Sequence, residues 1–210
     1  MRKTAALFLF LSVSICGSVK ADETRIHFDC GAYYFSQGPY ASEFQFQEFI
    51  QATQLMMTEE FEKVEGEVKG SIQFKTRYYM GSPGDDVQRG FSETHPAVAF
   101  IEGAGGASVF DEFRKSGMYP RILIFLNAPD AGLLAPDFPV DKVISLFGDG
   151  APESSRIEIK DPRRDFNLQI KGASYVNLWQ DLKLQKFLSD ILKIALLESL
   201  FPQEPAKESA

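Results

Sequence analysis

The segment of this sequence best suited to binding a ligand is the glycine-rich stretch EGAGGAS at residues 102–108. It lies between a stretch typical of a buried strand and a stretch typical of a helix. A glycine turn at such a place presents backbone N–H groups and a helix N-terminus, which suits an anion or a small polar group. Ser108 replaces the third glycine of the dinucleotide fingerprint G-x-G-x-x-G, and Glu102 would repel a phosphate. We therefore expect no cofactor here, and two interpretations stay open: a plain tight turn and a contact with a small polar ligand.

The histidines and cysteines do not form a recognisable reactive pattern. On a strand, His27 and Asp29 share one face, whereas Cys30 points to the other, so a Cys–His pair within this stretch is not expected. His27 and Asp29 could begin a metal site, but no H-x-x-x-H or C-x-x-C spacing supports one. No G-x-S-x-G or similar nucleophile motif occurs. We assign no catalytic residue and no metal site, and the sequence favours a protein that is not an enzyme.

A second set of candidate residues depends on how the strands are arranged. In a mainly parallel sheet, ligands bind beyond the carboxyl ends of the strands. Acids, an aromatic side chain and backbone donors at that edge suit a polar or cationic small molecule. The residues that we expect there, and predict as a ligand site, are Asp29, Tyr79, Glu102, Gly103, Gly105, Gly106, Ser108, Asn127 and Asp149.

The first half of the chain alternates between strand and helix patterns, so these residues would follow a βαβ arrangement. Ser42 and Gln45 form a capping box at the start of a helix with an apolar stripe. Apolar runs with β-branched and aromatic residues predict strands at 24–35, 71–80, 97–101 and 121–126. Periodicity and glycine caps predict helices at 42–64, 85–91 and 109–116. The unit from residue 97 to residue 126 predicts a parallel crossover.

The second half predicts a loop at 127–139, a strand at 140–147 and a hairpin in which 156–160 and 165–171 flank a polar tip. A final helix is expected over 175–201, and Pro202 would end it. The whole pattern predicts a single α/β domain with a mixed, largely parallel sheet. We expect helices on both faces, an antiparallel hairpin and a long C-terminal helix.

The N-terminus resembles an export signal. Arg2 and Lys3 precede an apolar run at 5–16, and small residues Val19 and Ala21 suit a signal-peptidase site. We expect a cleaved signal at 1–21, one domain at 22–202 and a flexible tail at 203–210. The run is too short to span a bilayer, which takes roughly 20 residues. The protein is therefore expected in the periplasm or secreted, with no transmembrane span.

Composition limits the possible functions of the exported part. The 210 residues are 44% hydrophobic and 24% charged, which is typical of a globular domain, and the net charge of −7 argues against nucleic acid as a partner. After cleavage Cys30 would be the only cysteine, so no internal disulfide can form. Two interpretations of Cys30 stay open: a buried small apolar side chain, which we favour, and a link to another chain.

The order of the predicted elements resembles the first lobe of periplasmic solute-binding proteins. The segment at 95–103, HPAVAFIEG, carries the resemblance best, since it is an apolar strand that ends in a glycine-containing turn. The resemblance covers about half of the chain, and the second lobe of a full binding protein has no counterpart. It implies an exported binding or accessory protein for a small polar solute. The alternative is an envelope protein that docks a protein partner through 127–139 or 156–171 without a small ligand, and a hydrolase is a third hypothesis.

Overall fold

The computed structural model describes residues 25–37, 42–64, 69–81, 83–134, 138–173, 176–177 and 179–200. Its centre is one six-stranded sheet in the order β2-β1-β3-β4-β5-β6, and every neighbouring pair is parallel. The strands are β1 (Arg25–Ser36), β2 (Lys69–Met80), β3 (Pro96–Glu102), β4 (Ile122–Leu126), β5 (Lys142–Gly148) and β6 (Asp165–Ile170). The predicted signal at 1–21 and tail at 203–210 lie outside the described residues.

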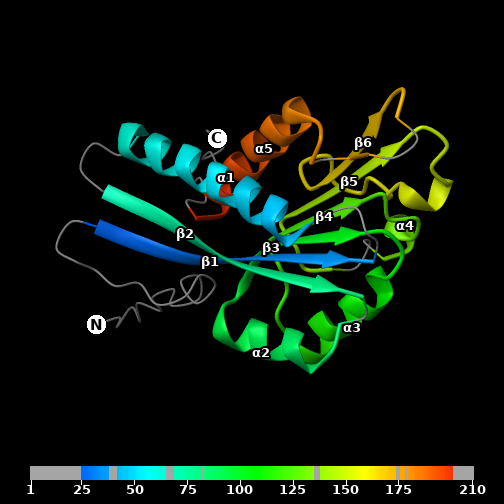
Figure 1. Cartoon of the computed structure of the whole chain (residues 1–210), viewed down its shortest axis with the longest axis horizontal. Coiled ribbons are helices and arrows are strands. Elements are labelled where there is room, and N and C mark those ends of the chain that lie inside the picture. Colours follow the sequence, from blue (N-terminus) through cyan, green and yellow to red (C-terminus); the bar gives the residue numbers. More distant parts are fainter. Residues whose placement is uncertain are drawn as a thin grey trace, which may run out of the picture.

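Helices cover both faces of this sheet, as predicted (Figure 1). One face carries α1 (Glu43–Val64) and α5 (Leu182–Leu200), and their side chains share a hydrophobic cluster with Tyr34, Phe100 and Leu146. The other face carries α2 (Asp85–Glu93), α3 (Gly106–Ser116), the short α4 (Ala131–Leu134) and the 3₁₀ turn η2 (Glu153–Ser155). The central strands β3 and β4 are buried along their whole length, because helices pack on both of their faces.

Local sequence signals account for the start of α1 and the end of α3. The Ser42 hydroxyl accepts a hydrogen bond from the Gln45 N–H at 3.2 Å, and the Gln45 side chain accepts one from the Ser42 N–H, so the predicted capping box is confirmed. Gly117 ends α3 in a left-handed conformation with φ of 66°. The α/β class and the parallel crossover from β3 to β4 are also confirmed.

Two predicted features of the second half are wrong. Residues 156–160 form no strand, and β6 pairs parallel with β5, so the sheet is wholly parallel and the hairpin does not exist. Four hydrogen bonds from two side chains of β6 account for this. Asp165 accepts hydrogen bonds from the backbone N–H groups of Lys160 and Asp161, and the Asn167 amide bonds the N–H and the carbonyl of Ile157. The segment that was predicted to be a strand is thus bonded to side chains of β6, not to its backbone.

The last helix begins later than predicted, at Leu182. The Asp181 Oδ1 accepts hydrogen bonds from the backbone N–H groups of Lys183 and Leu184, at N···O distances of 3.0 and 3.1 Å. It therefore caps the N-terminus of the helix. The described residues just before it, Val176, Asn177 and Trp179, are not helical. In the part of the chain that the structure describes, no helix combines the length and the apolar character needed to cross a membrane.

Candidate functional site

The chain changes direction across the sheet at the boundary between β1 and β3. These two strands are neighbours, but β1 leads to α1 on one face and β3 leads to α3 on the other. In a doubly wound parallel sheet, the crevice beyond the carboxyl ends at such a point is the usual ligand site. Here Ser36 ends β1 and Glu102 ends β3, and the two residues are partners in the strand register.

Glu102 is a buried carboxylate at this point. Its side chain is only 2% exposed, and the Ser36 hydroxyl donates a hydrogen bond to its Oε2 at 2.9 Å. The neighbouring Tyr78 belongs to β2, and its hydroxyl is hydrogen-bonded to Ser36. Burial raises the pKa of the Tyr78 hydroxyl, the Glu102 charge adds to this, and the hydrogen bond with Ser36 opposes it. A carboxylate is costly to bury, so a glutamate at a strand end of the sheet needs a specific reason.

Aromatic side chains surround this polar cluster of Ser36, Tyr78 and Glu102. Tyr34 stacks on Tyr78 with ring centroids 5.5 Å apart and on Phe100 at 5.8 Å. Trp179, from the segment before α5, lies 5.6 Å from Tyr34 and packs edge-on to Phe46 of α1. The cluster therefore combines a negative charge, two hydroxyl groups and aromatic rings. This combination suits a small ligand that carries a positive charge and hydrogen-bond donors.

The glycine turn after Glu102 is covered by a side chain of the protein itself. Gly105 has a φ of 152°, and a Cβ built there would lie 2.5 Å from the side chain of Gln37. Gln37 also donates a hydrogen bond through Nε2 to the Gly81 carbonyl at 2.8 Å, and its backbone N–H binds the Glu102 carbonyl. The positive φ thus favours glycine at 105, and Gln37 would have to move for any larger residue, which supports the tight-turn interpretation.

The other glycines and Ser108 also have structural roles. Gly103 has a φ of 75°, and a Cβ on Gly106 would lie 2.4 Å from Leu134. The Ser108 hydroxyl donates to the Gly105 carbonyl within the first turn of α3. Asp130 lies beside this turn, and burial raises the pKa of its carboxyl group. Its Oδ1 is buried and has no hydrogen-bond partner in the described part of the chain.

Asn127 and Asp149 lie further along the same edge, where they hold the segment that leads to α5. Asn127 has a φ of 50°, and its side-chain amide donates to the Val176 carbonyl and accepts from the Val176 N–H. Asp149 accepts hydrogen bonds from the Gly172 N–H and from Gln169. Both residues are at the predicted edge, but their printed contacts are to neighbouring segments of the chain.

Asp29 does not lie at the predicted edge of the sheet, whereas Tyr79 lies there but on the face opposite to Tyr78. Asp29 lies seven residues before the end of β1 and forms an ion pair with Lys75 at 3.2 Å, so β1 does not end near it as the prediction required. Tyr79 is near the end of β2, but it points to the face of α2 and stacks on Phe35. Adjacent residues of a strand face opposite ways, so Tyr78 takes the place that we expected for Tyr79.

Sequence reasoning missed Ser36, Tyr78 and Trp179. Ser36 and Glu102 lie on the same face because they are partners in the register of β1 and β3. The sequence does not reveal this register, so the pair could not be predicted. Trp179 was hidden inside the helix predicted for 175–201. No group of three or more potential metal ligands occurs among the residues that the structure describes.

Cys30 is fully buried in the cluster under α1 and α5. The structure thus supports a buried apolar role over a link to another chain.

Burial lowers the pKa of the other candidate reactive residue, His95, whose Nδ1 lies 3.1 Å from the Pro96 carbonyl oxygen.

No protein-family model, no curated protein and no solved structure matches this chain. The order of elements from β1 to β4 is the one that we predicted, and the resemblance to a solute-binding lobe stays a prediction.

Proposed function

We propose that this chain is an exported binding protein that holds a small, positively charged polar ligand at the β1/β3 carboxyl ends. The observation that carries the proposal is the buried Glu102, hydrogen-bonded to Ser36 at the point where the connections of the sheet diverge. Its surroundings of tyrosine and tryptophan rings favour a cation over an anion. The signal pattern at 1–21 supports export to the periplasm.

Glu102 is the group that confers charge selectivity in this proposal. The Ser36 hydroxyl orients the carboxylate, the Tyr78 hydroxyl is hydrogen-bonded to Ser36, and Trp179 packs on the neighbouring Tyr34. Gln37 is the residue that a larger ligand displaces first, because its side chain lies over the glycine turn and joins β1 to the end of β2.

Native mass spectrometry of the protein purified gently from the periplasm tests this. We expect a copurified small cation in the wild type and its loss in Glu102→Gln, which keeps the size of the side chain and removes the charge. Glu112→Gln is the matched control, because Glu112 is also a buried glutamate but bonds Gln88 and Lys115 on the other face. Equal ligand occupancy in wild type and Glu102→Gln would reject the site.

A thermal-shift screen covers ligands too weak to copurify. The probes are polyamines, basic amino acids and quaternary amines, each tested on the wild type and on both variants. We expect at least one probe to stabilise the wild type and Glu112→Gln but not Glu102→Gln. If every probe that stabilises the wild type stabilises Glu102→Gln equally, the charge assigned to the site is contradicted.

A further inference from the structure

The sheet face that carries α1 and α5 is only partly covered by the described helices. Six strands spaced about 4.8 Å apart extend over about 24 Å, and helices that pack side by side lie about 8–10 Å apart. A face of this width therefore accommodates three helices. In the described part of the chain, α1 packs on β2 and α5 on β4, and Ile144 and Leu146 of β5 are buried, so the third position lies over the edge strand β6 (Figure 1).

β6 is much less buried than β4. Every residue of β4 is buried, whereas Asp165 is the only buried residue of β6. The side chains of β6 that point toward α5 are all apolar: Phe166, Leu168 and Ile170. Phe166 is 37% exposed, although it is the largest of the three.

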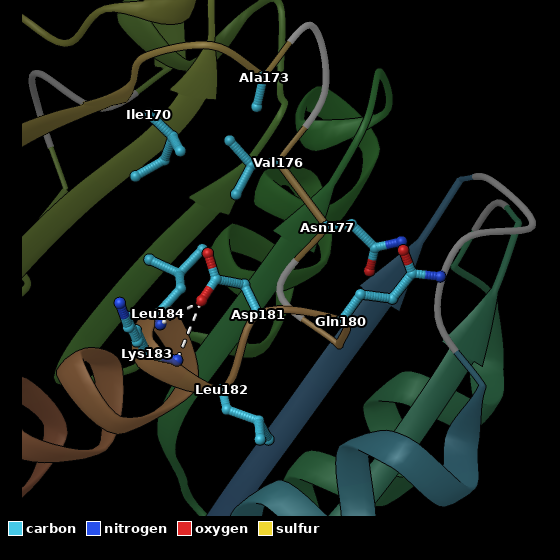
Figure 2. A pocket seen from close by; sticks show the side chains of 9 residues that line it. All are labelled: Ile170, Ala173, Val176, Asn177, Gln180, Asp181, Leu182, Lys183 and Leu184. Carbon is cyan, nitrogen blue, oxygen red and sulfur yellow. Dashed lines mark hydrogen bonds between the residues drawn. The ribbon is translucent and has the colours of Figure 1, made fainter.

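Two cavities lie along the boundary between β6 and α5. The first, of about 220 Å³, is lined by Phe166 together with Lys142, Ile191, Ile194 and Ala195. The second, of about 620 Å³, lies at the other end of β6, where Ile170, Val176 and Leu184 contribute apolar walls (Figure 2). From Leu184 to Ala195 the helix rises about 16 Å. The β6–α5 groove, defined by these two cavities, is thus about three helical turns long.

The exposed side of α5 extends the apolar surface of this groove. Phe187 is 44% exposed and Ile194 is 53% exposed, and both lie on the side of α5 that carries Ile191. Exposed apolar side chains that adjoin an apolar groove mark an interaction site. The width of the vacant position and the apolar walls on both sides fit a helix.

Two lysines and one aspartate line the groove, so its net charge is positive. The charged residues that line the two cavities are Lys142, Lys183 and Asp181. Asp181 caps α5 through its Oδ1, and Asp190 on the exposed side of α5 is paired with Lys186. A partner with acidic groups beside its apolar residues therefore complements the groove, although this chain as a whole is acidic.

We propose that the β6–α5 groove binds an amphipathic helix of a partner protein, with an apolar stripe flanked by aspartate or glutamate. The partner helix completes the third position on this face, in the manner of helix-in-groove recognition. Its apolar residues at positions i, i+3, i+4 and i+7 contact Phe166, Ile191 and Ile194. Its acidic residues face Lys142 and Lys183. This groove is separate from the Glu102 site, so either proposal can fail without the other.

A pair of synthetic peptides tests the proposal by fluorescence anisotropy. Each is a helix of about 18 residues with the same leucine stripe, one flanked by glutamate and the other by lysine. We expect the purified protein to bind the glutamate peptide at least about tenfold more tightly than the lysine peptide. Equal affinities, or no binding of either peptide, would overturn the proposal.

Two variants locate the binding. Ile194→Glu introduces an acid into the groove at an exposed position and should weaken binding of the glutamate peptide by about tenfold or more. Leu133→Glu is the matched control, since Leu133 is 76% exposed on α4, over the opposite sheet face. Equal loss of affinity in both variants would place the peptide elsewhere and overturn the proposal.

Other occupants of the groove give different results. If a second copy occupies it, light scattering shows a concentration-dependent dimer that Ile194→Glu abolishes, and the helix proposal is wrong. If residues 201–210 occupy it, their deletion raises the affinity for both peptides alike, which also overturns the proposal. A monomer whose affinity for the glutamate peptide is unchanged by that deletion supports the proposal.

Discussion

Two parts of the same sheet face differ in what they bury and what they expose. At the β1/β3 carboxyl ends a carboxylate and two hydroxyl groups are enclosed by aromatic rings, and Glu102 is only 2% exposed. At the β6–α5 groove the reverse holds, because Phe166, Phe187 and Ile194 remain accessible to solvent. Both arrangements are costly for a folded chain, since charge is buried in one and apolar surface is hydrated in the other.

The comparison indicates that recognition of small and large partners places different demands on one sheet. A small charged ligand requires a few oriented polar atoms in an enclosed place, and the diverging connections of β1 and β3 provide it. A helix requires a long apolar surface, and the incompletely covered strand β6 provides it. Substitutions that affect one region and not the other test whether the two are independent.

The largest effect is expected at Trp179, which lies between the two regions. It packs on Tyr34, Phe46 and Phe49 with ring centroids 5.6–6.4 Å apart. Trp179→Ala should lower the free energy of unfolding by about 3–5 kcal/mol, because it leaves a cavity in the aromatic cluster. Urea denaturation measures this loss.

Phe187→Ala is the matched control for that prediction. Phe187 is exposed on α5, so its loss should change the unfolding free energy by less than about 1 kcal/mol. The substitution should nevertheless weaken binding of the glutamate peptide, whereas the affinity of the Glu102 site for a small cation should not change. A large loss of stability in Phe187→Ala would mean that the groove is part of the core, contrary to the comparison.

A smaller effect is expected at Asn127, which ties β4 to the segment before α5. Asn127→Gly removes the two hydrogen bonds to Val176 and keeps the positive φ, and should cost about 1–2 kcal/mol in urea denaturation. Asn127→Ala should cost about 1 kcal/mol more, because alanine is strained in the left-handed region. If the two variants are equally stable, backbone conformation contributes nothing at this position.

The same substitution separates the two regions by function. Val176 lines the larger cavity of the groove, so Asn127→Gly should weaken peptide binding. Glu102 is held by Ser36 and not by Asn127, so binding of a small cation should persist. Loss of both peptide binding and cation binding would show that the two regions are coupled through the segment before α5.

Elements with strong local signals were predictable from the sequence. The Ser42–Gln45 capping box, the Gly117 cap and the apolar runs within β3 and β4 each depend on residues close in the chain, and the structure confirms them. The hairpin failed because the apparent strand at 156–160 is bonded to Asp165 and Asn167 by side chains. No local pattern separates that arrangement from a backbone ladder.

The candidate site was predictable in part, for the same physical reason. Glu102 and its turn follow directly from an apolar strand that ends in glycines, so their place at the edge of the sheet could be foreseen. Tyr78 could not be preferred over Tyr79, because the face of each depends on the register between β1 and β2. Ser36 joins Glu102 only through the pairing of β1 with β3, which is a long-range property.

The smallest effect is expected at Asp130, which lies beside the glycine turn on the opposite face. Burial raises the pKa of its carboxyl group above the ordinary 3.8, so the folded state retains the proton to higher pH than the unfolded state. Stability therefore falls as the pH rises above about 3.8, because the unfolded chain loses its proton first. Asp130→Asn should remove this dependence and be slightly more stable at pH 7, by well under about 1 kcal/mol because the group is partly exposed.

Thermal unfolding of wild type and Asp130→Asn across the pH range measures the difference, with Asp111→Asn, exposed on α3, as the control for the lost charge. The gap between wild type and Asp130→Asn should widen as the pH rises and close in acid. If Asp130→Asn is instead less stable at neutral pH, the nearby N-terminus of α3 stabilises the carboxylate more than burial opposes it. The charge of Asp130 would then belong with that of Glu102, as a second anionic group that the fold retains near this edge.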